Sequence, residues 1–312
     1  MSWSKSKIAL AVIGLVLVVG AILVKWVAAP ALVKIPTDLK KTTTIATGTG
    51  QYLSTSTAQK QDGEFTATRI VTGDGEAGTS SVAVWDVTLC LVDSKVAKPD
   101  ALGCVKQGQP GYLDEKHTDR IAIDRKSAEA VNDPRFRTAV EGDTSVKHEG
   151  VAYTFPLNTK KQTYRMWDAI AQKAADAKFE GTAKIEGLTA YKFHSQVPET
   201  DVKVQKIIQA KYTSDTTVYV EPKTGVILKG IQHISYTALG QTALDTTLTF
   251  TDDTVKSQAD FAKDQRNKIA LIQLWVPLIL LVVGVVLLLV AVGTASRKPT
   301  SKSNEPETVA AE

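Results

Sequence analysis

The sequence predicts a mainly β (α+β) protein: an antiparallel β-rich extracytoplasmic domain flanked by N- and C-terminal transmembrane helices. Two observations lead to this prediction. An apolar run lies near each end of the 312-residue chain. Between the runs, short stretches rich in β-branched and aromatic residues alternate with turn residues. We therefore expect a cytoplasmic N-terminus at 1–7, transmembrane helices at 8–29 and 272–293, the β-rich domain at 30–271, and a disordered cytoplasmic tail at 294–312.

The first apolar run, residues 8–24, follows Lys5 and Lys7. A basic start before an apolar run is also typical of a cleaved signal peptide, and "VAAPA" at 27–31 offers small residues for cleavage. The run is longer than the usual apolar region of a signal peptide, however, and Lys25 and Pro30 make a poor cleavage site. We expect a retained anchor and keep cleavage as the alternative.

The second apolar run, residues 274–292, contains no charged residue. At about 1.5 Å per residue it spans roughly 28 Å, close to the hydrocarbon thickness of a bilayer. A buried core helix seldom runs this long without a polar face, so we expect a second membrane span. Basic residues flank both runs on their outer sides, namely Lys5, Lys7, Arg297, Lys298 and Lys302. This pattern places both termini in the cytoplasm.

The charge of the chain argues against a nucleic-acid-binding protein. The chain has 37 basic and 33 acidic residues, and the spans and tails account for most of the difference. The nearly neutral remainder carries no electrostatic footprint for nucleic acid.

Cys90 and Cys104 are 14 positions apart, with no zinc-ligand pattern around them. In an oxidising compartment we expect them to form a disulfide contributing about 3 kcal/mol; two separate buried thiols are the alternative.

The central region reads as a series of strands. In "SVAVWDVTLCLV", residues 81–92, the period of two places Trp85, Leu89 and three other apolar residues on one face. In "VYVEPKTGVIL", Pro222 and Gly225 suit a turn, so the flanking valines and leucine should pair as a hairpin. Further strands are expected at 64–72, 119–124, 150–155, 188–197, 202–214, 216–220, 225–239 and 242–251.

Two segments are expected to be helical. "DAIAQKAADAKFEG", residues 168–181, is rich in alanine, and Asp168 can cap its start. "TVKSQADFAKDQRNKIALIQ", residues 254–273, should form a helix that continues into the second span.

Three segments follow one another between the spans: "KKQTYRMWD", "FEGTAKIEGLTAYKF" and "TVYVEPKTGVILKG". In order and topology the chain resembles an actinobacterial envelope family, a domain of unknown function also called the porin PorA family. The resemblance implies an extracytoplasmic domain held by two helices, and some mycolate-bearing relatives are associated with envelope glycolipid assembly. It carries over no catalytic residues. The residues matching the family motifs are Tyr164, Trp167, Asp168, Gly187, Tyr191, Pro222 and Gly225.

A membrane barrel of the porin type would need an apolar outward face on every strand. Lys203, Lys206, Lys211, Thr246 and Thr249 do not provide one, so we treat the family's porin name as a label.

The sequence offers little enzyme chemistry. "GDGEAG", residues 73–78, matches a dinucleotide fingerprint by letter but leads into a strand, so it is a loop. Asp114, Glu115, His117 and Asp119 cluster in "YLDEKHTDR", for which a solvated loop is a simpler explanation than a metal site. We therefore predict no catalytic residues, no cofactor and no metal.

Two spans bring the ends of the central domain to one membrane. We expect a non-enzymatic envelope protein whose domain binds or hands on a lipid or glycolipid, beside a membrane transporter or synthase. Trp85 and Leu89 are the candidate lipid contacts. The alternatives are a scaffold of a membrane complex without a ligand, an unrecognised hydrolase, or a porin. An apolar cavity of a few hundred Å³ would distinguish the lipid-binding hypothesis from the scaffold.

Overall fold

The computed structural model describes residues 4–54, 59–113, 116–204 and 208–293. They form two compact units: residues 34–266, here called the β unit, and the two apolar ends of the chain, up to residue 33 and from residue 267. The expected disordered tail at 294–312 lies outside the described residues. The domain limits at residues 30 and 271 remain predictions.

Helices lie near the two ends of the chain, and strands fill the region between them. Helical segments form its described ends: α1 (Lys5–Leu23), η1 (Val24–Ala28) and α2 (Ala29–Leu32), then α3 (Asp252–Ala270), η3 (Leu271–Trp275) and α4 (Val276–Gly293). A short 3-10 turn, η2 (Pro134–Phe136), lies between strands. The strands are β1 (Thr42–Leu53), β2 (Lys60–Gly73), β3 (Val82–Asp93), β4 (His117–Asp124), β5 (Ala139–Val140), β6 (Tyr164–Asp168), β7 (Lys173–Ile185), β8 (Leu188–Val204), β9 (Ile208–Val220), β10 (Ile227–Ala238) and β11 (Gln241–Phe250).

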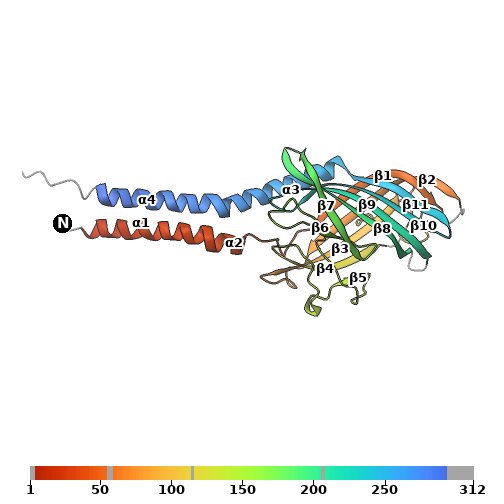
Figure 1. Cartoon of the computed structure of the whole chain (residues 1–312), viewed down its shortest axis with the longest axis horizontal. Coiled ribbons are helices and arrows are strands. Elements are labelled where there is room, and N and C mark those ends of the chain that lie inside the picture. The colour runs from red at the N-terminus through yellow and green to blue at the C-terminus, as the bar shows by residue number, and fades with distance from the viewer. Residues whose placement is uncertain (1–3, 55–58, 114–115, 205–207, 294–312) are drawn as a thin grey trace, which may run out of the picture. The chain divides into compact units, whose positions relative to one another are not determined.

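Both apolar runs are helical and long enough to cross a membrane, over Lys5–Leu32 and Asp252–Gly293. α1 and α4 lie side by side (Figure 1) and meet at two glycines. A Cβ on Gly14 would lie 2.8 Å from the Gly284 carbonyl oxygen, and a Cβ on Gly284 would lie 2.8 Å from that of Gly14. Glycines at such a crossing let helix backbones approach closely, which is a common way for helices to pack in a bilayer.

The eleven strands of the β unit form one antiparallel sheet in the order β5-β4-β3-β2-β1-β11-β10-β9-β8-β7-β6. Strands that are neighbours in the sheet are also neighbours in sequence, except at the centre, where β1 pairs with β11. The sheet therefore consists of two meanders, β1 to β5 and β6 to β11, joined along one seam. Figure 1 shows it curling into a half-barrel. The predicted mainly β, antiparallel fold with terminal apolar helices is confirmed.

Two short segments link the outer edges of this curled sheet. The amide of Val131 donates to the carbonyl of Ala122 on β4 (2.8 Å), and the amide of Ala130 donates to that of Gly150 (2.8 Å). The next residue, Val151, donates to Arg165 and accepts from Trp167, both on β6. Backbone hydrogen bonds thus run from β4 to β6, so neither edge is left with all its polar groups unpaired.

The predicted helix at 168–181 is wrong. Asp168 ends β6, and its side chain accepts hydrogen bonds from the amides of Ile170 and Ala171 (3.0 and 2.9 Å) in a turn rather than a helix. The chain then returns as β7, which pairs with β6 on one side and β8 on the other. Alanine has the highest helix propensity, but propensity is a weak determinant, and the ladder hydrogen bonds to two neighbouring strands outweigh it here.

Other strand predictions need smaller corrections. The segment predicted as a strand at 150–155 makes only isolated bridges at Val151. Residues 202–214 divide between β8 and β9, and the connection between them lies outside the described residues. β1 was not among the predicted strands, and its sequence, "TTTIATGTGQYL", holds two glycines. These glycines allow a close approach: a Cβ on Gly48 or Gly50 would lie 2.0 Å from a carbonyl oxygen of β11.

The helix expected at 254–273 is confirmed and continues into the second apolar helix. Within the β unit its first turns pack on the sheet through Ala259 and Ala262, both fully buried, against Leu188, Ala190 and Leu228. These alanines leave room for the backbone of α3 to lie close to β8 and β10.

Candidate functional site: a cavity inside the curled sheet

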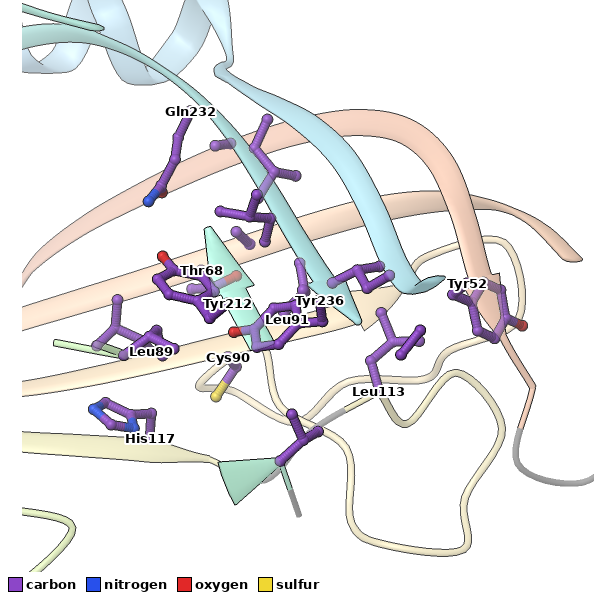
Figure 2. A pocket seen from close by; sticks show the side chains of 18 of the residues that line it. Tyr52, Thr68, Leu89, Cys90, Leu91, Leu113, His117, Tyr212, Gln232 and Tyr236 are labelled. Carbon is purple, nitrogen blue, oxygen red and sulfur yellow. The ribbon is translucent and has the colours of Figure 1, made fainter. Parts of the chain in front are cut away.

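The concave side of the β unit encloses a cavity of about 840 Å³. This volume lies in the upper part of the range for small-molecule sites. Side chains from β1 to β4 and from β8 to β11 form its walls, together with the loop at 108–113. Figure 2 shows Leu89, Leu91, Tyr212 and Tyr236 around it. Both meanders therefore contribute walls to the same cavity.

One end of the cavity, here called the hairpin end, is apolar and aromatic. Four residues lie opposite one another on successive strands of the sheet: Tyr52 on β1, Leu244 on β11, Tyr236 on β10 and Tyr212 on β9. Ala238 and the exposed Leu239 follow at the β10–β11 turn. Aromatic rings and aliphatic side chains thus form the wall at this end.

The other end, here called the polar end, is formed by Thr44, Arg69 and His117. Thr44 on β1, Arg69 on β2, Leu89 on β3 and His117 on β4 lie opposite one another on successive strands. Thr44 and Tyr52 are eight residues apart on β1, which corresponds to roughly 25 Å along a strand. His117 and Tyr52 appear at opposite sides of the close view (Figure 2). The cavity is therefore elongated, with different chemistry at its two ends.

Arg69 is the charged group of the polar end. Its guanidinium lies 5.7 Å from the ring centre of Tyr153 and 5.9 Å from that of Phe250, and one nitrogen is 3.5 Å from the Thr44 hydroxyl. Burial lowers the pKa of Arg69 below its ordinary value. In the described part of the chain, no carboxylate forms a salt bridge with Arg69 and its buried Nε has no hydrogen-bond partner.

The disulfide predicted between Cys90 and Cys104 is confirmed. Cys90 lies on the cavity wall, and the bond ties the loop after β3 back to that strand. The same loop continues into residues 108–113, which also line the cavity. The disulfide thus fixes the base of a loop that forms part of the site.

Of the two candidate lipid contacts, only Leu89 lies on the cavity wall. Trp85 is on the same face of β3 but farther along it, 4% exposed, in a core with Ile121, Phe155 and Phe193. The half-barrel is filled by side chains at that level, so Trp85 lies outside the wall of this cavity, and its role as a lipid contact stays a prediction.

A buried polar cluster lies where the sheet edges meet. The Asp119 carboxylate is fully buried and contacts His148 Nε2 (2.6 Å), the Tyr153 hydroxyl (2.5 Å) and Trp167 Nε1 (3.1 Å). Asp119 belongs to β4 and Trp167 to β6. The expectation of a solvated loop around Asp119 was therefore wrong: this side chain links the two edges of the sheet. Asp114 and Glu115 lie outside the described residues.

The outer face of the second meander carries a row of charges. His194 Nδ1 lies 3.3 Å from Glu180 and its Nε2 lies 2.9 Å from Asp215, while His233 lies 3.2 Å from Asp245. Asp215 is level with His233, so the row crosses β7 to β11. Of the residues predicted to make this face polar, Lys211 does so, Thr246 instead points inward and is buried, and Lys206 lies outside the described residues.

Residues 7–293 match the family model described as Porin PorA. This chain belongs to the Porin PorA family. A relative named "Porin PorA" from Corynebacterium amycolatum is 24% identical to it, over 40% of this chain and 45% of the relative. The match therefore spans less than half the length of that relative. Family membership supports a membrane or envelope protein.

In this PorA-family chain the first motif, Tyr164, Trp167 and Asp168, is structural. The Tyr164 hydroxyl accepts a hydrogen bond from the Lys160 amide (2.8 Å). Trp167 donates to Asp119, and Asp168 accepts from the Tyr212 hydroxyl (3.0 Å). Burial raises the pKa of Asp168. Tyr212 lines the cavity, so this motif supports the cavity wall from behind.

The other PorA motifs are turns. Glu186 and Gly187 both have positive φ, the geometry of a two-residue hairpin, and Tyr191 packs edge-on against Phe179. In the Pro222–Gly225 turn, Gly225 has φ +75°, and a Cβ there would lie 1.9 Å from the Phe155 carbonyl oxygen. The predicted hairpin is confirmed, with Val220 opposite Ile227.

Within the described residues there is no group of three or more His, Cys, Asp or Glu side chains arranged to hold a metal. His148 is the base of an Asp–His pair, but its Nδ1 has no hydrogen-bond partner in that part of the chain, so no hydroxyl is paired with it as a nucleophile. The cavity, which sequence reasoning anticipated only through Leu89, is the feature with the strongest binding chemistry.

Proposed function

We propose that this protein is a membrane-anchored envelope protein whose β unit binds a lipid or glycolipid in the cavity and hands it on beside a membrane transporter or synthase. The observation that carries the proposal is the elongated, mostly apolar cavity of about 840 Å³. A scaffold without a ligand would gain nothing from a void of this size, because unfilled apolar space costs stability. The proposal includes an outer location for residues 34–266 and cytoplasmic termini.

A strand-lined pore is the activity that the relative's name suggests. The charged row from Glu180 to Asp245 argues against it for this chain, because charges on the lipid face of a barrel are costly at the bilayer midplane. We expect the purified protein to give no single-channel steps in planar bilayers. Reproducible conductance at nanomolar protein would favour the pore instead.

The lipid proposal is tested by filling the cavity. Leu91 lines it, whereas Val96 is exposed and outside it. In Leu91→Trp we expect a large loss of co-purifying lipid, read by native mass spectrometry of the detergent-extracted protein with lipid identification. Val96→Trp is the matched control and should keep the wild-type lipid content.

A second readout separates loss of lipid from loss of folding. Because Trp adds volume to a void rather than to a packed core, Leu91→Trp should melt near or above the ligand-free wild type. A wild-type protein that carries no lipid and binds none when lipid is added back would refute the proposal and leave the scaffold in its place.

A further inference from the structure

The polar end of the cavity holds a cation that the described chain does not neutralise. Arg69 is half-buried, with its Nε withdrawn from solvent, and a cation withdrawn from water is normally paired with a carboxylate or phosphate. Arg69 instead has one long hydrogen bond to Thr44 and two aromatic rings beside it. The buried carboxylate that the Tyr153 hydroxyl contacts, Asp119, is also engaged by His148 and Trp167.

His117 supplies a second polar group at the polar end of the cavity. His117 uses Nδ1 to contact Glu141 (3.0 Å), while its buried Nε2 has no hydrogen-bond partner in the part of the chain described. Both His117 and Arg69 lie on the cavity wall, one strand away from Leu89 on either side. Polar groups left open at one end of an apolar cavity are typical of a site that orients an amphiphile.

We infer that the cavity takes an amphiphile with an anionic headgroup, held at Arg69 with His117 beside it, and with its acyl chain toward Tyr52, Tyr236 and Leu239. The inference rests on the proposed function and adds the headgroup charge and the direction of the ligand. A guanidinium binds carboxylate and phosphate oxygens in the same forked geometry. A free fatty acid and an anionic phospholipid therefore share the required chemistry.

The test uses the full-length protein in neutral detergent after lipid removal, titrated with three probes by native mass spectrometry. Palmitate supplies a carboxylate, dipalmitoyl phosphatidic acid supplies a phosphate, and monopalmitoylglycerol is the uncharged control. We expect the wild type to bind at least one anionic probe about tenfold to a hundredfold more tightly than the uncharged one, as a charge-assisted hydrogen bond provides. The anion that binds more tightly identifies the headgroup.

Arg69→Met should remove this preference while changing the affinity for monopalmitoylglycerol by less than about threefold. Arg69→Lys should keep part of it, because the charge remains without the fork. Arg135→Met, at an arginine whose side chain is 77% exposed, is the matched control and should leave all three affinities unchanged. The ligand-free Arg69→Met protein should melt no lower than wild type, because an unpaired cation has been removed.

The outcomes are separable. A wild type that binds all three probes equally, or an Arg69→Met variant that still prefers the anions, overturns the anionic headgroup but leaves lipid binding intact. If Arg69→Met does not fold, the wild-type preference and the Arg69→Lys result decide. Binding of none of the probes, with no endogenous lipid found, overturns the proposed function itself.

Discussion

Asp119 is a carboxylate without exposed surface that contacts three side chains from different parts of the chain. A buried charge is tolerated only when its oxygens are occupied by donors. Trp167 supplies one of these donors from the opposite edge of the sheet. The indole thus acts both as core volume and as a hydrogen-bond donor.

The two roles separate when two buried tryptophans are compared. Trp167→Phe removes ring volume and the donor to Asp119, whereas Trp85→Phe removes similar volume from an indole whose Nε1 has no partner in the described structure. We expect Trp167→Phe to lower the free energy of unfolding by about 1–3 kcal/mol more than Trp85→Phe. Urea unfolding of the two variants measures the difference, and equal losses would mean that the hydrogen bond contributes nothing.

Two buried tyrosines give a pH dependence. Burial, reinforced by the charge of Asp119, raises the pKa of Tyr153 well above its ordinary value; burial and the charge of Asp168 do the same for Tyr212. The folded state therefore keeps these phenols protonated, and their contribution to stability is present below pH about 10, the unfolded pKa. It is lost as the pH rises above that value toward the folded pKa.

We expect alkaline titration of the folded protein, followed by tyrosinate absorbance, to show a late phase that coincides with loss of folded structure. The same titration in denaturant should show one earlier phase. In the Tyr153→Phe, Tyr212→Phe double variant the late phase should disappear. A late phase that persists in that variant would assign it to other tyrosines.

Turns, rather than strands, fix how the elements of the β unit meet. The Pro222–Gly225 turn joins β9 to β10, and it also receives the segment after Thr154: the Phe155 amide donates to the Gly225 carbonyl (2.9 Å) and the Thr159 amide to that of Pro222 (2.8 Å). Phe155 then stacks on Phe193 and packs edge-on against Tyr164. One tight turn therefore positions part of the main core.

Gly225→Ala tests this role against a turn that has no such contact. Gly187 has a similar positive φ, +78°, but nothing near its missing Cβ, so Gly187→Ala should cost only the left-handed backbone penalty of about 1–2 kcal/mol. Gly225→Ala adds a clash with the Phe155 carbonyl and should cost clearly more. Thermal denaturation of both variants provides the comparison; equal losses would show that the segment after Thr154 moves aside freely.

An element of this fold can be predicted from the sequence when its own residues determine its conformation, and not when distant strands do. The Pro222–Gly225 hairpin was predictable because its turn residues specify φ directly. β7 was not, since "KAADAKFE" has no β signal of its own and becomes a strand through its two neighbours. The cavity was only partly predictable: the alternation of β3 marks an apolar face, but whether that face is filled, as at Trp85, or left open, as at Leu89, depends on side chains from distant strands.

At the scale of the whole molecule, the two apolar helices meet at Gly14 and Gly284, where each backbone carbonyl leaves no room for a side chain. The contact is compatible with the retained first anchor that its length predicts. If both spans are retained, we expect both termini to lie on one side of the membrane.

A cysteine accessibility experiment checks this arrangement. Ser4→Cys should be protected from an impermeant maleimide in intact cells, and Ser145→Cys, at an exposed position of the β unit, should be labelled. The basic flanks of both runs provide the physical reason. Labelling of Ser4→Cys, or a mature N-terminus near Pro30, would contradict the two-anchor topology.

The seam between β1 and β11 has a consequence for how the protein folds. Every other strand pairing joins neighbours in sequence, so each meander can form through local connections, while the seam brings together segments about two hundred residues apart. Such distant pairing is slow because the loop-closure entropy is lost before contacts compensate for it. The cavity has walls from both meanders and does not exist until that step is complete. A lipid that binds there would contact both meanders at once. Because it would bind only the folded half-barrel, a higher lipid concentration would raise the free energy of unfolding of the β unit.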